Sequence, residues 1–405
     1  MAAELIIRNA KLRSGEQVDI AISDSKYAEI AANITDSATQ ELDAAGSLVT
    51  ESFTVAQLHL DKVYTVDWLE EAAAGYFDEG MGGAMTTIEL AAEVKRYYQE
   101  GEVLERMNRA LTNAALAGAT HIRAFIDIDS KAELKGFKAA LRAKEQWQDR
   151  LKLQLVAFAQ DGLSREPGAE EYMWEAMELG ADVVGGIPWI EYTDTDMERH
   201  TDITFQMATK YDKDLTSLVD DAGDPNLRTS EYLAVSSVRH GWQGRVVASQ
   251  ARASALYNEV YHRKWVEVLR QGGVGIVTNP HSGPLHVRVH ELAQAGVTLA
   301  LGGESVHDAY YPFGRCNMLE AAFVSAHTLW SMEPEDQELL YDMITLNGAK
   351  LMRLPEHRIA VGNEASLVVL QDDSVREALT HHREPRYVIF KGKVTAQSTS
   401  ESRIV

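Results

Sequence analysis

The central part of the chain alternates short apolar runs with longer amphipathic segments. The segments 130–151 and 286–296 have the periodicity of helices. Eight apolar runs of strand length surround such segments, at 53–60, 120–129, 153–160, 181–188, 214–220, 245–250, 274–279 and 297–303. Eight strands that alternate with helices are typical of a (β/α)8 barrel, so we predict an α/β fold with a TIM-like barrel.

The two ends of the chain have a different pattern. Residues 1–50 and 356–405 contain short strand-like runs separated by turn residues, with a predicted hairpin turn at 391–393. Two β-rich ends that flank one central body predict a small β-sandwich domain built from both termini. The barrel domain is then expected over residues 51–355, with a loop of its mouth at 75–86.

Composition narrows the class of protein. The chain has 405 residues, of which 45% are hydrophobic and 25% charged, as in ordinary soluble globular proteins. Its net charge of -22 argues against nucleic acid and anionic membranes as partners, because both attract basic patches. No apolar run has the length of a transmembrane helix, and the N-terminus lacks a signal-peptide pattern. The single cysteine, Cys316, fits a reducing cytosol, so we expect a cytoplasmic protein.

Polar residues gather where the predicted strands end. In a (β/α)8 barrel these ends meet at one mouth, which is where the chemistry takes place. They carry Gln57, His59, Asp127, Asp129, Gln160, Asp161, Glu191, Asp220, Asp221, Gln250, Asn279, His281, Glu304 and Ser305. Each residue alone is as readily explained as a solvated loop residue or a helix cap. The set as a whole favours a pocket for a small molecule.

Five stretches resemble one known superfamily. They are HLDKVYT (59–65), LQLVAFAQDG (153–162), GADVVGGIP (180–188), YYPFGRCNML (310–319) and ASLVVL (365–370). The chain is similar in these stretches to the amidohydrolase superfamily, in the branch of cytosine deaminase and N-isopropylammelide isopropylaminohydrolase. The resemblance runs in order across nearly the whole chain. It implies a barrel with a β-sandwich from both termini and a hydrolase that acts on C–N bonds other than peptide bonds.

The resemblance also locates the family's metal ligands, and most of them are replaced here. The His-x-His at the end of the first barrel strand corresponds to Gln57 and His59, and the metal His of the fifth strand to Leu218. The His of the sixth strand, which assists the attacking water, corresponds to Gln250, and the Asp of the last strand to Glu304. The loss is not random decay, because three of these positions keep hydrogen-bonding side chains.

This ligand set predicts that no metal cofactor is bound. A catalytic zinc or iron usually takes at least three strong donors, amide oxygens are weak donors and leucine has none. The alternative is zinc or iron in another arrangement, held by His59, Glu304 and Asp220 or Asp221.

Three residues are predicted to carry the catalysis. Asp221 corresponds to the acid/base residue of the family, so it would move protons, with His59 and Glu304 as helpers. The neighbouring Asp61 and Lys62 are expected to form a buried ion pair that steadies the loop after the first barrel strand.

A further set is predicted to bind the substrate. Gln160 corresponds to the Gln that hydrogen-bonds the pyrimidine in cytosine deaminases, and a carboxamide offers both a donor and an acceptor. Trp189 and Tyr310 would contact a flat ligand, or they are aromatic residues of the core. Ser305 stands where a carboxylate is expected, so the substrate preference should differ from cytosine. The full set is Gln57, Gln160, Gln250, Asp220, Trp189, Ser305 and Tyr310.

Two functions remain open from the sequence. The first is an enzyme that acts on a small, polar, nitrogen-containing and cyclic compound, by C–N hydrolysis or deamination or by a metal-independent elimination, isomerisation or cyclisation. The second is a catalytically inactive binding or regulatory subunit, for which Leu218 in a ligand position is the indication. The family resemblance also implies a homo-oligomer.

Overall fold

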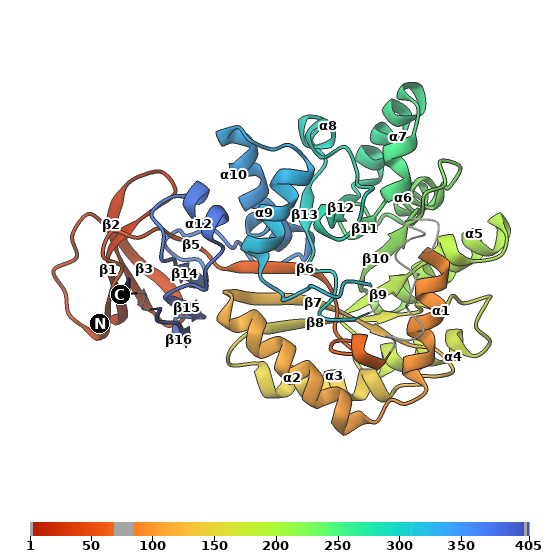
Figure 1. Ribbon diagram of the computed structural model, residues 1–405, viewed down its shortest axis with the longest axis horizontal. Helices are drawn as coiled ribbons and strands as arrows, with labels where there is room; N and C mark the ends of the chain where they lie inside the picture. Colours follow the sequence, from red (N-terminus) through yellow and green to blue (C-terminus); the bar gives the residue numbers. More distant parts are fainter. Residues whose placement is uncertain (1–2, 69–83, 309, 401–402, 405) are drawn as a thin grey trace.

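The computed structural model describes residues 3–68, 84–308, 310–400 and 403–404 (Figure 1). An eight-stranded parallel sheet forms the barrel, with its strands in sequence order. The strands are β6 (Phe53–His59), β7 (Ala119–Asp127), β8 (Lys152–Phe158), β9 (Val183–Gly186), β10 (Asp214–Val219), β11 (Val246–Gln250), β12 (Gly275–Thr278) and β13 (Leu299–Leu301). The eight predicted strands are therefore confirmed, with ends that differ by a few residues.

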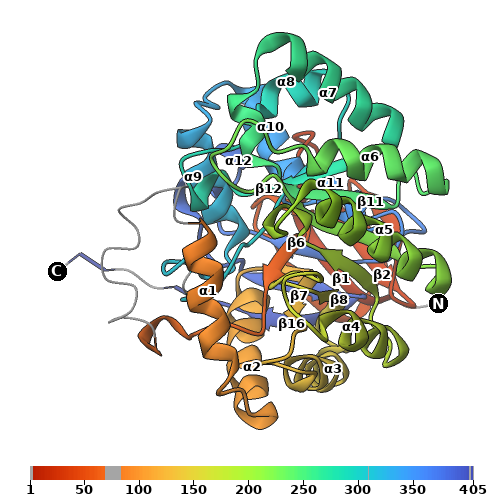
Figure 2. The ribbon, with the colours of Figure 1, turned by 90° about the vertical axis from the view of Figure 1, so that its right-hand side faces the viewer.

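Helices surround the barrel, as Figure 2 shows along the strands. Most bury one apolar face against the sheet, as expected for a barrel covered on its outside. They are α1 (Ala84–Lys95), α2 (Glu100–Leu116), α3 (Lys135–Trp147), α4 (Ala169–Glu178), α5 (Asp194–Tyr211), α6 (Thr229–His240), α7 (Glu259–Gly272), α8 (Val289–Gln294), α9 (Met318–Thr328), α10 (Pro334–Met343) and α11 (Leu346–Leu351). Of the predicted mouth loop 75–86, residues 84–86 begin α1 and the rest lies outside the described residues.

The last strand returns to the first and closes the barrel at the mouth. The backbone N–H of His59 donates to the carbonyl of Glu304 at 2.8 Å, and the N–H of Gly303 donates to the carbonyl of Gln57 at 2.7 Å. The pairing of β6 with β7 shifts between Val55 and Leu58, which is a bulge beside Gln57. Bulges re-aim side chains next to functional sites, and here the bulge lies where the catalytic strand end is predicted.

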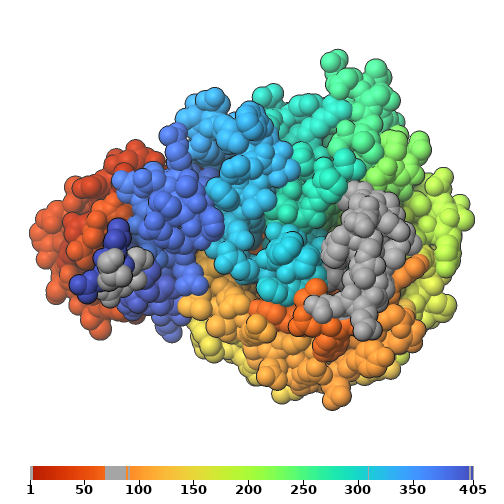
Figure 3. Space-filling model, viewed as in Figure 1, coloured from red at the N-terminus to blue at the C-terminus, as the bar shows by residue number. Residues whose placement is uncertain are grey.

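A β-sandwich from both termini lies beside the barrel (Figure 3). Its first sheet has β1 (Ala3–Lys11), β2 (Gln17–Ser23), β3 (Lys26–Ala31) and β4 (Ala38–Asp43); its second has β5 (Val49–Glu51), β14 (Leu367–Val369), β15 (Tyr387–Phe390) and β16 (Lys393–Gln397), with α12 (Val375–His381) between β14 and β15. Inward residues of both sheets share one apolar core, including Ile7, Ile20, Val49 and Val369. The predicted fold of barrel plus sandwich is confirmed. Within the described residues, no helix is long and apolar enough to cross a membrane.

Candidate active site

Several strand ends at the mouth have an unusual backbone. Asp220, Gln250 and Glu304 follow or end β10, β11 and β13, and all three have positive φ, at 48°, 71° and 56°. Such a conformation costs non-glycine residues roughly 1–3 kcal/mol and is enriched at functional sites. The three residues with this strained backbone are therefore residues that the sequence predicts for the active site.

Glu304 is the centre of a cluster of carboxamides. Its Oε2 accepts hydrogen bonds from Nε2 of Gln250 at 2.5 Å, from Nδ2 of Asn279, and from Nε2 of Gln57 at 3.5 Å. All four side chains are buried. We call Gln57, Gln250, Asn279 and Glu304 the amide cluster. It brings together three predicted site residues and Asn279, which the sequence indicated only as one of many strand-end residues.

Asp221 and Glu304 influence each other through their charges. Burial is the main cause that raises the pKa of both carboxyl groups, that of Asp221 to about 7, and the charge of Glu304 raises the pKa of Asp221 further. Arg252 opposes this effect, with its Nε 2.8 Å from Oδ1 of Asp221. The remaining guanidinium nitrogens of Arg252 donate to Ser282 and to the carbonyl of Leu285. Two carboxyls with raised pKa beside one cation can divide protonated and ionised roles between them near neutral pH.

The ring of His59 lies among aromatic side chains. It stacks on Tyr310 with ring centroids 5.6 Å apart, and it contacts Phe125 at 5.5 Å and Phe158 at 5.6 Å. Burial, reinforced by the ammonium of Lys62, holds the pKa of His59 well below its usual range, so the imidazole is neutral at pH 7. Its Nδ1 is buried and has no hydrogen-bond partner in the described part of the chain.

The predicted substrate-binding residues Gln160, Trp189 and Tyr310 line the same region. Trp189 and Tyr310 pack in one apolar cluster with Leu218, Phe125 and Phe158. Three of their polar atoms are buried without a hydrogen-bond partner among the described residues: Oε1 of Gln160, Nε1 of Trp189 and the hydroxyl of Tyr310. Unpaired buried polar atoms are costly, so a polar ligand would satisfy them. Ser305 is fully buried on the loop that follows β13.

Asp220 does not face the other predicted site residues. Its Oδ1 accepts from the backbone N–H of Thr229 at 2.7 Å and from the Thr229 hydroxyl at 2.6 Å. Its Oδ2 accepts from the N–H and hydroxyl of Ser230 and from the hydroxyl of Tyr257 at 3.3 Å. A carboxylate with five donors at the first turn of α6 has the role of a helix cap rather than of a ligand contact.

A network of buried lysines and aspartates occupies the ends of β6, β7 and β8. Nζ of Lys62 lies 3.3 Å from Asp61, which is the expected ion pair, and 2.6 Å from Asp127. Nζ of Lys95, the last residue of α1, lies 3.1 Å from Asp127, 2.6 Å from Asp129 and 3.0 Å from Asp161. We call Asp61, Lys62, Lys95, Asp127, Asp129 and Asp161 the lysine network.

Three residues at or near the mouth escaped the sequence analysis. Arg252 begins the short 3-10 helix Arg252–Leu256 and Lys95 ends α1, and the strand pattern gives no signal at either place. Asp308 is buried on the loop after β13, and its Oδ1 accepts from the backbone N–H groups of Tyr310 and Tyr311 at 2.9 and 3.1 Å. Burial raises the pKa of Asp308 to about 7. The Asp-x-Tyr-Tyr sequence that forms this turn was the available signal.

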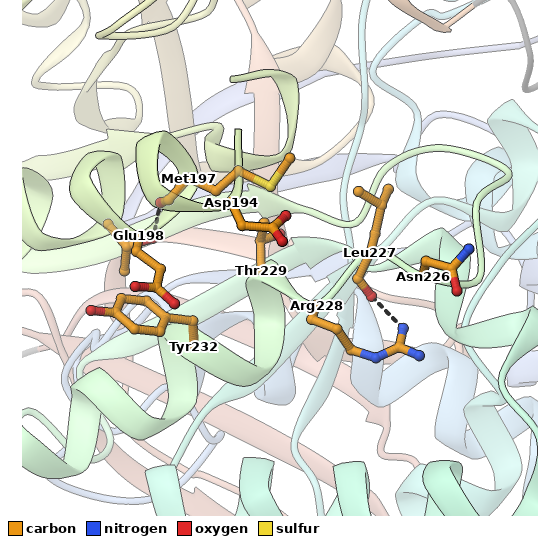
Figure 4. Close-up of a pocket in the computed structure, with 9 residues that line it drawn as sticks. Asp194, Met197, Glu198, Asn226, Leu227, Arg228, Thr229 and Tyr232 are labelled. Atoms are coloured by element: carbon orange, nitrogen blue, oxygen red, sulfur yellow. Dashed lines mark hydrogen bonds between the residues drawn. The ribbon is translucent and has the colours of Figure 1, made fainter. Parts of the chain in front are cut away.

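A separate cavity of about 210 Å³ lies between α5 and α6 (Figure 4). Met197 and Glu198 of α5 face Leu227 and Tyr232 across it. Two of the lining residues also contact the mouth: Thr229 donates to Asp220, and Leu227 packs against the apolar cluster of Leu218 and Trp189. None of the predicted site residues lines it, so we place the candidate site at the strand ends and not here.

Comparison with known proteins decides the family. A model described as the amidohydrolase family matches residues 19–396. The chain belongs to the amidohydrolase family. The predicted family is therefore confirmed.

Relatives of this amidohydrolase-family chain extend over nearly its whole length. It is 29% identical over 397 residues to N-isopropylammelide isopropyl amidohydrolase from Pseudomonas sp. strain ADP, covering 96% of both chains. It is 24% identical over 404 residues to pterin deaminase from Rhizobium rhizogenes, covering 96% of this chain and 90% of the relative. The crystal structure of 5-methylcytosine deaminase from Klebsiella pneumoniae, liganded with 5-fluorocytosine, superposes with a TM-score of 0.91 at 26% identity and 99% coverage of each chain.

The donors at the mouth do not fit the divalent metal ion that the family resemblance implies. Leu218 packs in the apolar cluster and offers no ligand atom. Gln57, Gln250 and Asn279 turn N–H groups towards Glu304, and N–H groups repel a cation. Within residues 3–68, 84–308, 310–400 and 403–404, no three His, Cys, Asp or Glu side chains are grouped to hold a metal ion.

Proposed function

We propose that this amidohydrolase-family protein is an enzyme for a small, cyclic, nitrogen-containing compound and that it breaks a C–N bond by acid/base chemistry without a metal ion. The named relatives support the substrate class, because they are called deaminases or amidohydrolases of pterin, methylcytosine and N-isopropylammelide. Assembly as a homo-oligomer and a cytoplasmic location stay predictions.

The observation that carries the proposal is the pair of Asp221 and Glu304. Burial raises the pKa of both carboxyl groups, and the charge of Glu304 raises that of Asp221 further. Two interacting carboxyl groups of this kind can share one proton, so one member accepts a proton while the other donates one. Arg252, in contact with Asp221, steadies the ionised form.

A hydrolytic step uses the pair as follows. The ionised carboxylate takes a proton from a water molecule while the water oxygen bonds to the ring carbon that bears the nitrogen. The protonated carboxyl gives its proton to that nitrogen, the C–N bond breaks, and a carbonyl forms on the ring carbon as the remaining hydroxyl proton leaves to the carboxylate. Water is consumed and an amine or ammonia is released, so the atoms balance. The same pair would serve an elimination, an isomerisation or a cyclisation, which need proton transfer only.

The remaining predicted residues would hold the ligand. The free carboxamide oxygen of Gln160 accepts a hydrogen bond and the indole N–H of Trp189 donates one, which suits a ring edge that carries both N–H and carbonyl groups. Tyr310 and Phe158 supply flat apolar contacts, and the neutral His59 stacks on Tyr310. Gln57 acts on the ligand indirectly, since its amide already binds Glu304 and Asn279, whereas Oε1 of Gln250 has no partner among the described residues and would accept a hydrogen bond from the ligand.

The test is a screen followed by one matched pair of variants. The protein is incubated with cyclic ureas, pyrimidines, triazines and pterins, with ligand binding followed by thermal shift and turnover by released ammonia or amine. For any compound turned over, Asp221→Asn should lower kcat by about 10²–10⁴-fold while binding remains. Asp224→Asn, on the exposed part of the same loop, should leave kcat unchanged. Unchanged turnover in Asp221→Asn would contradict the assigned role.

A second function is favoured by one observation. Leu218, Phe125, Phe158 and Trp189 make much of the mouth apolar, as in a binding site that performs no chemistry. A compound that binds in the thermal-shift screen without turnover at any pH from 5 to 9 would favour a ligand-binding or regulatory subunit over the enzyme.

A further inference from the structure

We infer that the side-chain amides of Gln57, Gln250 and Asn279 take the place of a divalent cation at Glu304, so that N–H groups of the protein itself neutralise this carboxylate. The inference rests on the metal-independent part of the proposed function. It extends that function, because it assigns a positioning task to Asn279 and predicts how a cation site can be created.

In the amide cluster, several side chains bind one common atom. Three N–H donors, from the ends of β6, β11 and β12, meet at the single oxygen Oε2 of Glu304. In a metal site one cation would be shared by several oxygens; here one oxygen is shared by several donors. Either arrangement would hold the barrel together in the same way. Here β6, β11 and β12 are all linked to Oε2 of Glu304.

Asn279 is the hub of the cluster. Its Nδ2 donates to Oε2 of Glu304 and also to Oε1 of Gln57 at 3.3 Å. Its Oδ1 accepts from the backbone N–H of Gly302 at 2.9 Å. Each polar atom of this side chain therefore has a partner, and the partners fix which end of the amide carries the nitrogen.

The space around the hub is filled. A Cβ on Gly302 would lie 2.7 Å from Oδ1 of Asn279 and 3.0 Å from Cβ of Gln57, so only glycine fits at this position. A cation would have to displace the amide groups to reach Oε2 of Glu304. The close packing thus leaves the amide N–H groups as the direct contacts of Oε2 of Glu304.

Replacing one amide of the cluster by a carboxylate should create a cation site at Glu304. Asn279→Asp keeps the shape of the side chain but replaces two N–H donors by an oxygen that faces Glu304. Two carboxylates, with the amide oxygens of Gln57 and Gln250 free to turn inward, then offer the oxygen ligands that hard divalent cations prefer. Gln250→Glu makes the same exchange from a different strand.

Manganese binding tests the inference. Mn²⁺ is titrated into the wild type, Asn279→Asp, Gln250→Glu and the control Asn33→Asp on an exposed loop, with free Mn²⁺ read by electron paramagnetic resonance and folding checked by circular dichroism. We expect one Mn²⁺ per chain in Asn279→Asp and Gln250→Glu, with a Kd at least tenfold lower than in the wild type and the control.

Two results would overturn the inference. One is tight stoichiometric Mn²⁺ binding by the wild type, and the other is binding by the folded variants no tighter than in the control. If Asn279→Asp does not fold, Gln250→Glu decides. Failure of the proposed function has another signature, which is the absence of turnover for every C–N compound, because Mn²⁺ binding is measured without substrate.

Discussion

Two groups of buried carboxylates lie on either side of β6 at the barrel mouth, and they are neutralised in different ways. In the lysine network, towards β7 and β8, the carboxylates contact full ammonium charges. In the amide cluster, towards β11, β12 and β13, the single carboxylate of Glu304 contacts neutral amides. The two groups share the strand that carries Gln57 and His59.

The two groups differ in what stabilises or destabilises the ionised form of their carboxyl groups. In the lysine network, contact with Lys95 helps to hold the pKa of Asp129 below its usual range, whereas burial and the charge of Asp127 raise the pKa of Asp61 to about 6 in spite of Lys62. In the amide cluster, burial raises the pKa of Glu304, and the charge of Arg252 and the hydrogen bonds from Gln250 and Asn279 oppose this rise. We call the ion-paired lysine network the rigid side of the mouth, and the amide cluster together with Asp221 the titrating side.

The largest expected effect is on the rigid side. Lys95→Met removes the cation from three buried carboxylates, and the loss of one partner from a buried ion pair costs about 3–5 kcal/mol of unfolding free energy. Urea denaturation measures this change. The matched control is Lys144→Met, whose partner Asp182 is partly exposed, for which we expect about 0–1 kcal/mol. If Lys95→Met and Lys144→Met lose the same unfolding free energy, the lysine network does not contribute more to stability than a partly exposed ion pair.

A smaller effect is expected on the titrating side. Gln250→Leu removes one of three donors from Glu304 and leaves the others, which should cost about 1–3 kcal/mol of unfolding free energy. Gln146→Leu, on an exposed helix face, should change it by less than about 0.5 kcal/mol. The comparison fails if Gln250→Leu is as harmless as Gln146→Leu in the same urea titration.

A further effect on the titrating side is a change of stability with pH. The pKa of Asp221 is raised from 3.8 to about 7 in the folded protein, so its contribution to stability is full below pH 4 and is lost as the pH rises through 7. Each pKa unit corresponds to about 1.4 kcal/mol. Asp221→Asn lacks this loss, so its unfolding free energy relative to the wild type should increase from pH 4.5 to pH 7.5. A difference that is constant with pH, or that decreases, would disprove the raised pKa.

The sequence predicted the barrel because apolar runs alternate with amphipathic helical segments along the chain. It predicted Gln57, Gln250 and Glu304 as site residues because they lie at the ends of predicted strands. Lys95 and Arg252 could not be predicted in this way. They reach the mouth from the end of α1 and from a short 3-10 helix, and only the folded chain brings them to Asp127 and Asp221.

Asp220 is a residue that the sequence predicted for the site but whose carboxylate binds the start of α6. It follows its strand as Asp221 does, and no local signal separates the two residues. The distinction comes from Thr229 and Ser230, which lie about ten residues later and turn back to bind only the first carboxylate. Contacts between a strand end and the following helix are set by the loop path, which the hydrophobic pattern does not encode.

The most direct test of the central claim is the metal content of the wild-type protein. The protein is produced in medium with added zinc, iron and manganese, purified without chelator, and analysed by plasma mass spectrometry, with melting curves before and after dialysis against EDTA. Side chains that take the place of a cation predict far less than one metal ion per chain and an unchanged melting temperature. One equivalent of zinc, iron or manganese, with a lower melting temperature after its removal, would contradict the account.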